Sequence, residues 1–379
     1  MPKFREDISA LTPYEVGRPV EEAAREHGLN PDSIVKLAAN ESPEGPFPGA
    51  VEAAAAALTG ANRYPDNDLW DLSGALASEL GADRSNLLFG NGSVALITDI
   101  ANATAGPGAN VVYGWPSFIM YRFATVWSGA DRVEAPLRRD HSLDLDAIAA
   151  AVDHDTRAVF ICNPNNPTGT ITAADEIEAL IAYVPDSTVV VVDEAYHEYV
   201  SDERYRTAVP IALENPNVIV LRTFSKIYSL AALRIGYAVG RPETLTEVRK
   251  TQQPLTVNQP AQAAALASLG RPDEITRRVE ANAIARGGLL VALAVRGLPH
   301  AESHANFIFF RLGDRLGGDS RAAASELMKR GAIIRPMSSG WARVTVGAEA
   351  ENRRFVEALD ETSESTGGVR RARPWLDTT

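Results

Sequence analysis

Residues 188–196 read TVVVVDEAY, in which four valines lead into two acidic residues, an alanine and a tyrosine. β-branched residues without polar alternation are typical of a strand that is buried on both faces of a mostly parallel sheet. We therefore expect a core strand over Thr188–Asp193. Five more runs have a similar apolar texture and are also predicted to be strands: Asn86–Phe89, Asn110–Tyr113, Ala158–Cys162, Val218–Arg222 and Ile235–Val239.

The segments between these runs are long enough to hold crossover helices. Val94–Ala105 and Ala173–Tyr183 have helical composition, and Thr172 is a suitable N-cap for the second. Strands that alternate with helices predict an α/β, doubly wound fold. After residue 255 the texture changes to Ala/Leu/Arg-rich helices and short strands, which predicts a smaller α+β unit. A chain of 379 residues is also too long for one small core.

Composition narrows the class of partners. The formal net charge of -12 argues against nucleic acid or an anionic membrane as the main partner. One cysteine excludes an intramolecular disulfide, and the six histidines form no metal-binding motif, so no metal is expected. The chain has no apolar h-region at its start and no apolar run of about 18 residues, which leads us to expect a cytoplasmic protein.

Polar residues follow several of the predicted strands, at the sheet edge where ligands bind in open α/β folds. The turn at 90–93 reads GNGS before a helix, which suits either a plain turn or an anion site. The segment 163–169 reads NPNNPTG and suits a rigid turn or a set of amide ligands. Asp193 closes a buried strand, where it either forms a structural ion pair or cap, or balances a positive ligand.

Lysine is scarce, so the search for an amine nucleophile is short. The chain has five lysines, and the basic total of 37 is otherwise arginine. Lys226 alone follows a core strand on the ligand side, with Ser225 before it and Arg234 eight residues later; Lys36 is its only rival. Burial or a neighbouring cation makes such a lysine nucleophilic. A lysine, a buried acid, a phenol, an amide and an anion site together predict pyridoxal 5'-phosphate (PLP), joined to Lys226 as a Schiff base.

Four motifs carry a resemblance to a known family. NPNNPTG (163–169), DEAY (193–196), TFSK (223–226) and LRIGY (233–237) resemble fold type I, class II aminotransferases. Within that group, LTPYEVGRPVEE (11–22), IVKLAANESP (34–43), NRYPD (62–66), IIRP from 333 and WARVTVG (341–347) resemble histidinol-phosphate aminotransferases. The resemblance implies a mostly parallel seven-stranded sheet in a large domain, 45–260, a small domain formed by 1–44 and 261–362, and a flexible tail, 363–379.

The resemblance also implies roles for individual residues. Lys226 would be the Schiff-base lysine and proton shuttle, Asp193 would face the pyridine nitrogen, and Asn166 and Tyr196 would bond the ring 3-oxygen. The remaining roles divide between the two ligands. Phosphate contacts are expected from the backbone of Ser93 and Val94, from Ser225 and Arg234, and from Tyr64 of a partner subunit in a homodimer; ring stacking is expected from Phe118, and substrate contacts from Arg343, Arg335, Asn40 and Tyr14.

Two features point to a different substrate. The glycine-rich turn continues as GSVAL (92–96), and 115–118 read WPSF, both of which resemble actinobacterial aromatic amino acid aminotransferases. We expect transfer between histidinol phosphate and 2-oxoglutarate, with an aromatic amino acid as the alternative substrate. A catalytically inactive PLP-fold binding protein and a nucleotide-dependent dehydrogenase are the rivals. The sequence lacks the GxGxxG turn that the dehydrogenase requires.

Overall fold

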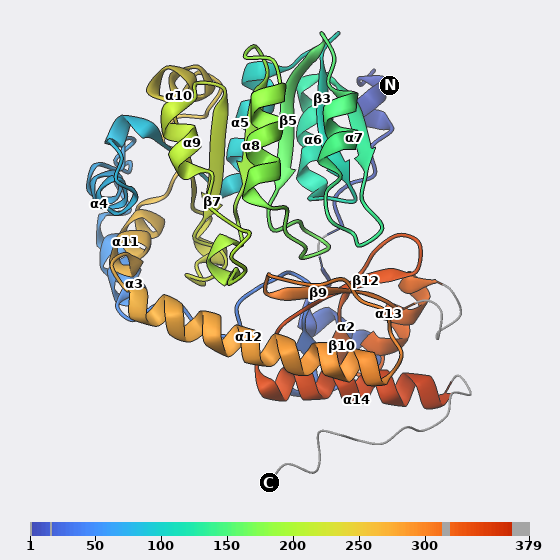
Figure 1. Ribbon diagram of the computed structural model, residues 1–379. Helices are drawn as coiled ribbons and strands as arrows, with labels where there is room; N and C mark the ends of the chain where they lie inside the picture. Colours follow the sequence, from blue (N-terminus) through green and yellow to red (C-terminus); the bar gives the residue numbers. More distant parts are fainter. Residues whose placement is uncertain (1, 16, 313–318, 366–379) are drawn as a thin grey trace. The chain divides into compact units, whose positions relative to one another are not determined.

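The computed structural model describes residues 2–15, 17–312 and 319–365, and these residues form two compact units (Figure 1). Unit 1 contains the described residues of Met1–Thr12, Gly45–Asn166 and Thr170–Thr276. Unit 2 contains those of Pro13–Glu44, Pro167–Gly169 and Arg277–Thr379. Each unit has its own hydrophobic core.

Unit 1 is organised around a seven-stranded sheet with β6 at its centre (Figure 1). β8 runs antiparallel to both of its neighbours, and all other neighbouring strands are parallel. In spatial order the strands are β2 (Leu87–Gly90), β8 (Gly236–Gly240), β7 (Val218–Thr223), β6 (Val189–Asp193), β5 (Thr156–Cys162), β3 (Asn110–Trp115) and β4 (Asp131–Pro136).

Helices cover both faces of this sheet (Figure 1). One face is covered by α5 (Ser93–Thr104), α6 (Ile119–Ser128) and α10 (Pro242–Arg249), whose apolar residues share one cluster with Phe160, Val191 and Leu221 of the strands. Successive strand residues point to opposite faces, so Val190, Val192 and Val220 face the other side. That side carries α7 (Leu145–Ala151), α8 (Ala174–Tyr183) and α9 (Val209–Glu214). The sheet is thus buried on both faces, as its continuous apolar strands predict.

The rest of unit 1 consists of shorter helices. α11 packs on α3 and α4, and α1 packs on α6. Their bounds are α1 (Glu6–Ser9), α3 (Ala50–Ala57), α4 (Trp70–Leu80) and α11 (Gln259–Ser268).

Unit 2 contains two small sheets packed with helices. β1 (Val35–Lys36) pairs in parallel with β10 (Ala332–Ile333), while β12 lies between β11 and β9 in an antiparallel sheet. Leu289, Leu327, Phe310 and Phe355 belong to its main apolar cluster. The other elements are α2 (Val20–His27), α12 (Pro272–Val295), β9 (Phe307–Arg311), α13 (Ser320–Met328), β11 (Arg335–Pro336), β12 (Trp341–Thr345) and α14 (Glu349–Ser365).

The predicted fold class is confirmed, and each predicted strand of the large sheet lies within two residues of an observed one. The sequence did not predict β4, because three of its six residues DRVEAP are charged and it lies at the edge of the sheet. No helix within the described ranges is long and apolar enough to span a membrane.

The units divide the chain after Glu44, where an expected boundary also lies, and after Thr276 rather than after residue 260. Residues 261–276 group with unit 1, since α11 contacts α3 and α4. Residues 2–12 also group with unit 1, where Arg5 donates hydrogen bonds to the carbonyls of Val126 and Trp127. Of the expected tail 363–379, residues 363–365 continue α14, and 366–379 lie outside the described residues.

Candidate active site

Asp193 ends the central strand β6 and is almost completely buried, with 2% of its surface exposed. The hydroxyl of Tyr121 donates a hydrogen bond to Oδ2 at 2.8 Å, and the backbone N–H of Ala195 donates to Oδ1 at 3.2 Å. Both donors are neutral. A carboxylate in this position therefore retains a demand for positive charge.

The environment of Asp193 shifts its pKa. Burial raises the pKa of Asp193 from 3.8 to about 6, against the lowering effect of the hydrogen bonds from Tyr121 and Ala195. The charge of Glu194 raises this pKa further, and the charge of Lys226 lowers it. A positively charged ligand at Asp193 would stabilise the carboxylate and reverse the effect of burial.

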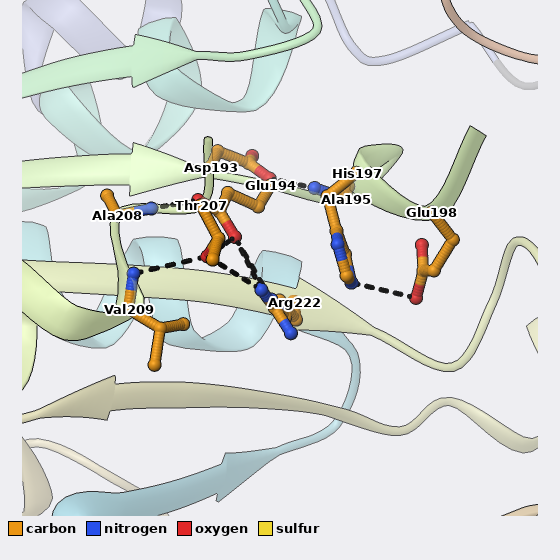
Figure 2. Close-up of polar contacts among 9 residues, drawn as sticks. All are labelled: Asp193, Glu194, Ala195, His197, Glu198, Thr207, Ala208, Val209 and Arg222. Atoms are coloured by element: carbon orange, nitrogen blue, oxygen red, sulfur yellow. Dashed lines mark hydrogen bonds and ion pairs between the residues drawn. The ribbon is translucent and has the colours of Figure 1, made fainter. Parts of the chain in front are cut away.

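Glu194 is the next residue and is equally buried, but both of its carboxylate oxygens accept hydrogen bonds and one of them is paired with an arginine (Figure 2). Its Oε2 accepts hydrogen bonds from Arg222 Nε at 3.0 Å and Nη2 at 2.9 Å, and from the Thr207 hydroxyl at 2.8 Å. Its Oε1 accepts from the backbone N–H of Ala208 at 2.6 Å. A structural ion pair was one of the alternatives for Asp193. The ion pair is formed instead by Glu194, the residue that follows Asp193.

Lys226 lies in the turn after β7, the strand that is parallel and adjacent to β6. The carboxyl ends of these two strands meet at one sheet edge, which brings Lys226 to the side of Asp193. Lys226 is partly buried, and its Nζ lies 5.5 Å from the centroid of the Tyr196 ring. Asn166 Nδ2 donates to the Tyr196 hydroxyl at 3.4 Å. Residues from three separate motifs thus meet at this edge.

An anion site lies where α5 begins. Gly92 has a φ of 77°, and a Cβ built on it would come within 2.4 Å of Arg234 Nη2. A Cβ on Gly236 would lie 2.5 Å from the backbone nitrogen of Ser93. Because Gly92 and Gly236 have no side chain, the guanidinium of Arg234 can lie beside the N-terminus of α5. The backbone N–H groups at such a helix terminus favour an anion. Val94 follows Ser93 in the first turn of this helix.

The hydroxyl of Ser225 accepts a hydrogen bond from the Thr223 hydroxyl at 3.0 Å. Both residues belong to the segment that leads from β7 to Lys226. Ser225 is buried, and the hydrogen bond fixes its side chain within that segment.

Phe118 is the N-cap residue of α6, and its ring lies 5.8 Å from the ring of Tyr121 at an interplanar angle of 89°. The preceding residue, Ser117, donates to Asn165 Oδ1 at 2.7 Å and so connects this turn to the segment that carries Asn166. Unlike the other residues expected to contact the cofactor, Tyr64 has 85% of its surface exposed.

The four expected substrate residues all belong to unit 2 and lie near one another there. Arg335 of β11 is directly opposite Arg343 of β12, and its guanidinium lies 5.2 Å from the centroid of the Tyr14 ring. Arg343 donates to the carbonyl of Ala38 at 2.8 Å. Asn40 is joined to β12 through Thr345, whose hydroxyl accepts from the Asn40 N–H at 2.9 Å.

Two contributors were not predicted from the sequence. Arg222 was predicted only as a strand residue. A buried arginine needs a buried acid as its counter-charge, and Glu194 of the DE pair is that acid. Tyr121 was assigned no role from the sequence. The sequence signal that could have identified Tyr121 is its spacing of three residues from Phe118, which places both side chains on one face of a helix.

Comparison with known proteins gives this geometry a family. A family model described as aminotransferase class I and II matches residues 32–359. The chain belongs to this family. It is 43% identical to histidinol-phosphate aminotransferase 1 of Cupriavidus pinatubonensis, over 93% of this chain and 94% of that protein. It is 41% identical to an aromatic amino acid aminotransferase of Thermobifida fusca, over 94% of this chain and 96% of that protein.

Solved structures agree with this assignment. The crystal structure of histidinol-phosphate aminotransferase from Sinorhizobium meliloti in complex with pyridoxal-5'-phosphate has a TM-score of 0.87 and 30% sequence identity, and the match covers 96% of this chain and 98% of that one. The aminotransferase described here is accordingly PLP-dependent, and the predicted cofactor is confirmed. The expectation of an enzyme of this class is confirmed as well.

The residues of this aminotransferase fit PLP on their own chemistry. Asp193 is a buried acid that accepts hydrogen bonds from two neutral donors, the Tyr121 hydroxyl and the Ala195 N–H, which suits the partner of a protonated ring nitrogen. Gly92 and Gly236 keep side-chain atoms out of the space beside Arg234 and Ser93, which suits a phosphate. A lysine on the same sheet edge supplies the amine.

Proposed function

We propose that this aminotransferase transfers an amino group between histidinol phosphate and 2-oxoglutarate. The observation that carries the proposal is the 43% identity, over nearly the whole of both chains, to a relative with the name histidinol-phosphate aminotransferase 1. The cofactor residues would serve any amino acid substrate of this enzyme class, so the choice of substrate rests on this relationship together with the phosphate-binding capacity of arginine.

PLP, when bound, supplies an aldehyde that accepts the amino group and a ring that acts as an electron sink. Asp193 would hold a proton on the ring nitrogen, because an anionic carboxylate in a dry environment favours a positive partner. Lys226 would hold the cofactor through its amine in the resting enzyme, and its free amine would accept and return a proton during amino transfer.

We propose the other cofactor contacts for residues of unit 1. Asn166 and Tyr196, which are hydrogen-bonded to each other, are proposed to bond the ring 3-oxygen. The backbone N–H groups of Ser93 and Val94, with the side chains of Ser225 and Arg234, are proposed to bind the phosphate. Phe118 is proposed to stack on the ring face, a role that any aromatic side chain supports.

Substrate contacts are proposed for the residues of unit 2. Arg343 would bind the carboxylate or phosphate of the substrate, because a guanidinium offers two parallel donors to such a group. Arg335, which lies opposite Arg343 on β11, adds positive charge. Tyr14 and Asn40 would line the substrate end of the site.

We also propose a homodimer with shared active sites, in which Tyr64 contributes to the phosphate site of the partner subunit. Support comes from the exposure of Tyr64 and of Val51, Leu58, Trp70 and Leu266 on neighbouring helices of unit 1. Mixing a Tyr64→Phe chain with a Lys226→Ala chain tests this. Shared sites predict recovered activity, because one site per mixed dimer then has both residues, whereas separate sites predict none.

An aromatic amino acid is the second candidate substrate. It is favoured by the GSVAL and WPSF segments and by the relative from Thermobifida fusca, which bears the name aromatic amino acid aminotransferase. Values of kcat/KM for histidinol phosphate and for phenylalanine, each with 2-oxoglutarate, separate the two. We expect the value for histidinol phosphate to be higher. A strong preference for phenylalanine would overturn the first assignment and leave the enzyme class intact.

A further inference from the structure

Tyr121 is the buried residue that contacts both the predicted acid and the predicted ring-stacking residue. It lies on α6 and is fully buried. Its hydroxyl donates to Asp193 Oδ2 at 2.8 Å, and its ring meets the ring of Phe118 edge-on at 5.8 Å. One side chain thus links the residue at the ring nitrogen with the residue at the ring face.

The position of Tyr121 is fixed by packing. Its ring is stacked on Phe160 of β5, with centroids 4.8 Å apart and an interplanar angle of 15°. Tyr113 of β3 packs against another side at 5.9 Å. Because rotation of the ring would break these contacts, the hydroxyl has a defined direction, and it is directed at Asp193.

The environment of Tyr121 favours its protonated form, which is the form that donates to Asp193. Burial, and then the charge of Asp193, raise the pKa of Tyr121 well above its ordinary value. The other titratable groups around Asp193 are Cys162 of β5, Glu194 at the end of β6 and Lys226 after β7. Burial also raises the pKa of Cys162, so the thiol is neutral, and Glu194 is occupied by Arg222. Of the hydrogen bonds to Asp193, the one from Tyr121 has the larger effect in favouring its charged form.

We propose that Tyr121 is a positioning residue for amino transfer, which keeps Asp193 ionised and correctly oriented so that the proton stays on the ring nitrogen of PLP. The inference rests on the role proposed for Asp193. Without the donor, the carboxylate becomes more basic, and the shared proton moves from the ring nitrogen toward Asp193. The ring then withdraws electrons less well, although Asp193 itself is unchanged.

Tyr121→Phe tests the proposal, because it removes the hydroxyl and retains the ring packing. The matched control is Tyr113→Phe: Tyr113 is equally buried in the same apolar cluster, but its hydroxyl donates to Glu134 Oε1 at 3.1 Å. Both holoenzymes are prepared with 15N-labelled PLP, and the 15N chemical shift of the ring nitrogen is recorded. A hydrogen bond to a charged group changes the equilibrium between the two proton positions by about 10- to 100-fold.

We expect the 15N signal of Tyr121→Phe to move toward the value of an unprotonated pyridine, and kcat to fall about ten-fold with little change in the KM of the amino donor. Tyr113→Phe should leave the 15N signal at the wild-type position. An unchanged 15N signal in Tyr121→Phe, or an equal change in both variants, overturns the proposal.

Asp193→Asn separates this inference from the function on which it rests. If Tyr121 acts through Asp193, then Tyr121→Phe has no further effect on the 15N signal in the Asp193→Asn background. If Asp193→Asn alone leaves the 15N signal unchanged, the role proposed for Asp193 is wrong. An effect of Asp193→Asn without an effect of Tyr121→Phe overturns only the inference.

A second variant applies if Tyr121→Phe does not fold. 3-Fluorotyrosine at position 121 keeps the shape of the side chain and has a more acidic hydroxyl, which is a stronger donor. It should move the 15N signal in the opposite direction, toward the protonated form. A shift in the same direction as that expected for Tyr121→Phe, or no shift, contradicts the proposal.

Discussion

Two adjacent carboxylates at the end of β6 show how one strand separates a functional site from a structural one. Asp193 faces the side of the sheet with α6 and accepts hydrogen bonds from two neutral donors. Glu194 faces the other way and is bound by an arginine, a threonine hydroxyl and a backbone N–H. Burial is the same for both, so burial does not distinguish them. What distinguishes them is whether the protein supplies the counter-charge itself.

The difference has a physical consequence for folding. A buried acid that has its own cation contributes to a rigid core, while breaking such a pair is costly. A buried acid without one is destabilising until a ligand supplies the charge. The contribution of Asp193 to stability therefore depends on the cofactor, whereas the contribution of Glu194 depends on Arg222. Four changes test this contrast.

Asp193→Asn should have the largest effect, and the effect should be on catalysis. The amide cannot stabilise a positive ring nitrogen, so we expect kcat at saturating PLP to fall about 10³- to 10⁴-fold. Thermal unfolding of the variant should be as cooperative as that of the wild type. A kcat within a few-fold of the wild-type value would show that Asp193 is not the functional member of the pair.

Glu194→Gln should have the opposite profile. It leaves Arg222 buried without its counter-charge, which lowers the free energy of unfolding by about 3–5 kcal/mol. Urea unfolding measures this loss, and Arg222→Met combined with Glu194→Gln should recover part of it. The kcat of the folded enzyme should change little. A large loss of kcat together with an unchanged free energy of unfolding would reverse the assignment of the two acids.

Removal of PLP should make the stability of unit 1 depend on pH through Asp193. Its folded pKa, about 6, lies above the ordinary value of 3.8, so the folded state keeps a proton that the unfolded state has lost. Stability from this group is therefore full below about pH 4 and is lost as the pH rises to about 6, by roughly 3 kcal/mol.

The melting temperatures of cofactor-free wild type and cofactor-free Asp193→Asn, measured from pH 4 to 8, test this dependence. We expect the Asn variant to become the more stable of the two above pH 6. Added PLP should remove the advantage, because the ligand stabilises the wild-type carboxylate. A constant difference across this pH range would contradict the raised pKa.

Thr207→Ala should have the smallest effect. The hydroxyl of Thr207 donates to Glu194 at 2.8 Å and accepts from Arg222 Nη2 at 2.7 Å. Its loss should lower the free energy of unfolding by about 1 kcal/mol, because the ion pair itself remains. The 15N signal of the ring nitrogen should not move. A change in that signal would mean that the two sides of β6 are not independent.

Much of the large sheet could be predicted from the sequence, because strands buried on both faces consist of continuous apolar runs. β4 could not, since an edge strand with exposed Asp131 and Arg132 lacks that pattern. Residues 261–276 group with unit 1 because α11 packs on α3, a long-range contact that cannot be read from the composition of α11, which resembles that of the later helices.

In the site, too, local sequence predicted individual residues but not their long-range partners. Asp193 and Lys226 were predicted because the first ends a strand and the second follows one, which are properties of local sequence. The counter-charge of Glu194 comes from Arg222 on another strand, and the donor to Asp193 comes from Tyr121, 72 residues away in the chain. Such partners are set by strand order and helix packing. A DE pair therefore does not reveal which acid is occupied by the protein and which is left for a ligand.

The most direct test of the central claim is the identity of the lysine that carries PLP. The purified protein should absorb near the violet edge of the visible range, and borohydride should remove this absorbance and fix the cofactor to one peptide. We expect mass mapping to place the label on Lys226. A label on Lys36, or a colourless protein that takes up no added PLP, would contradict it.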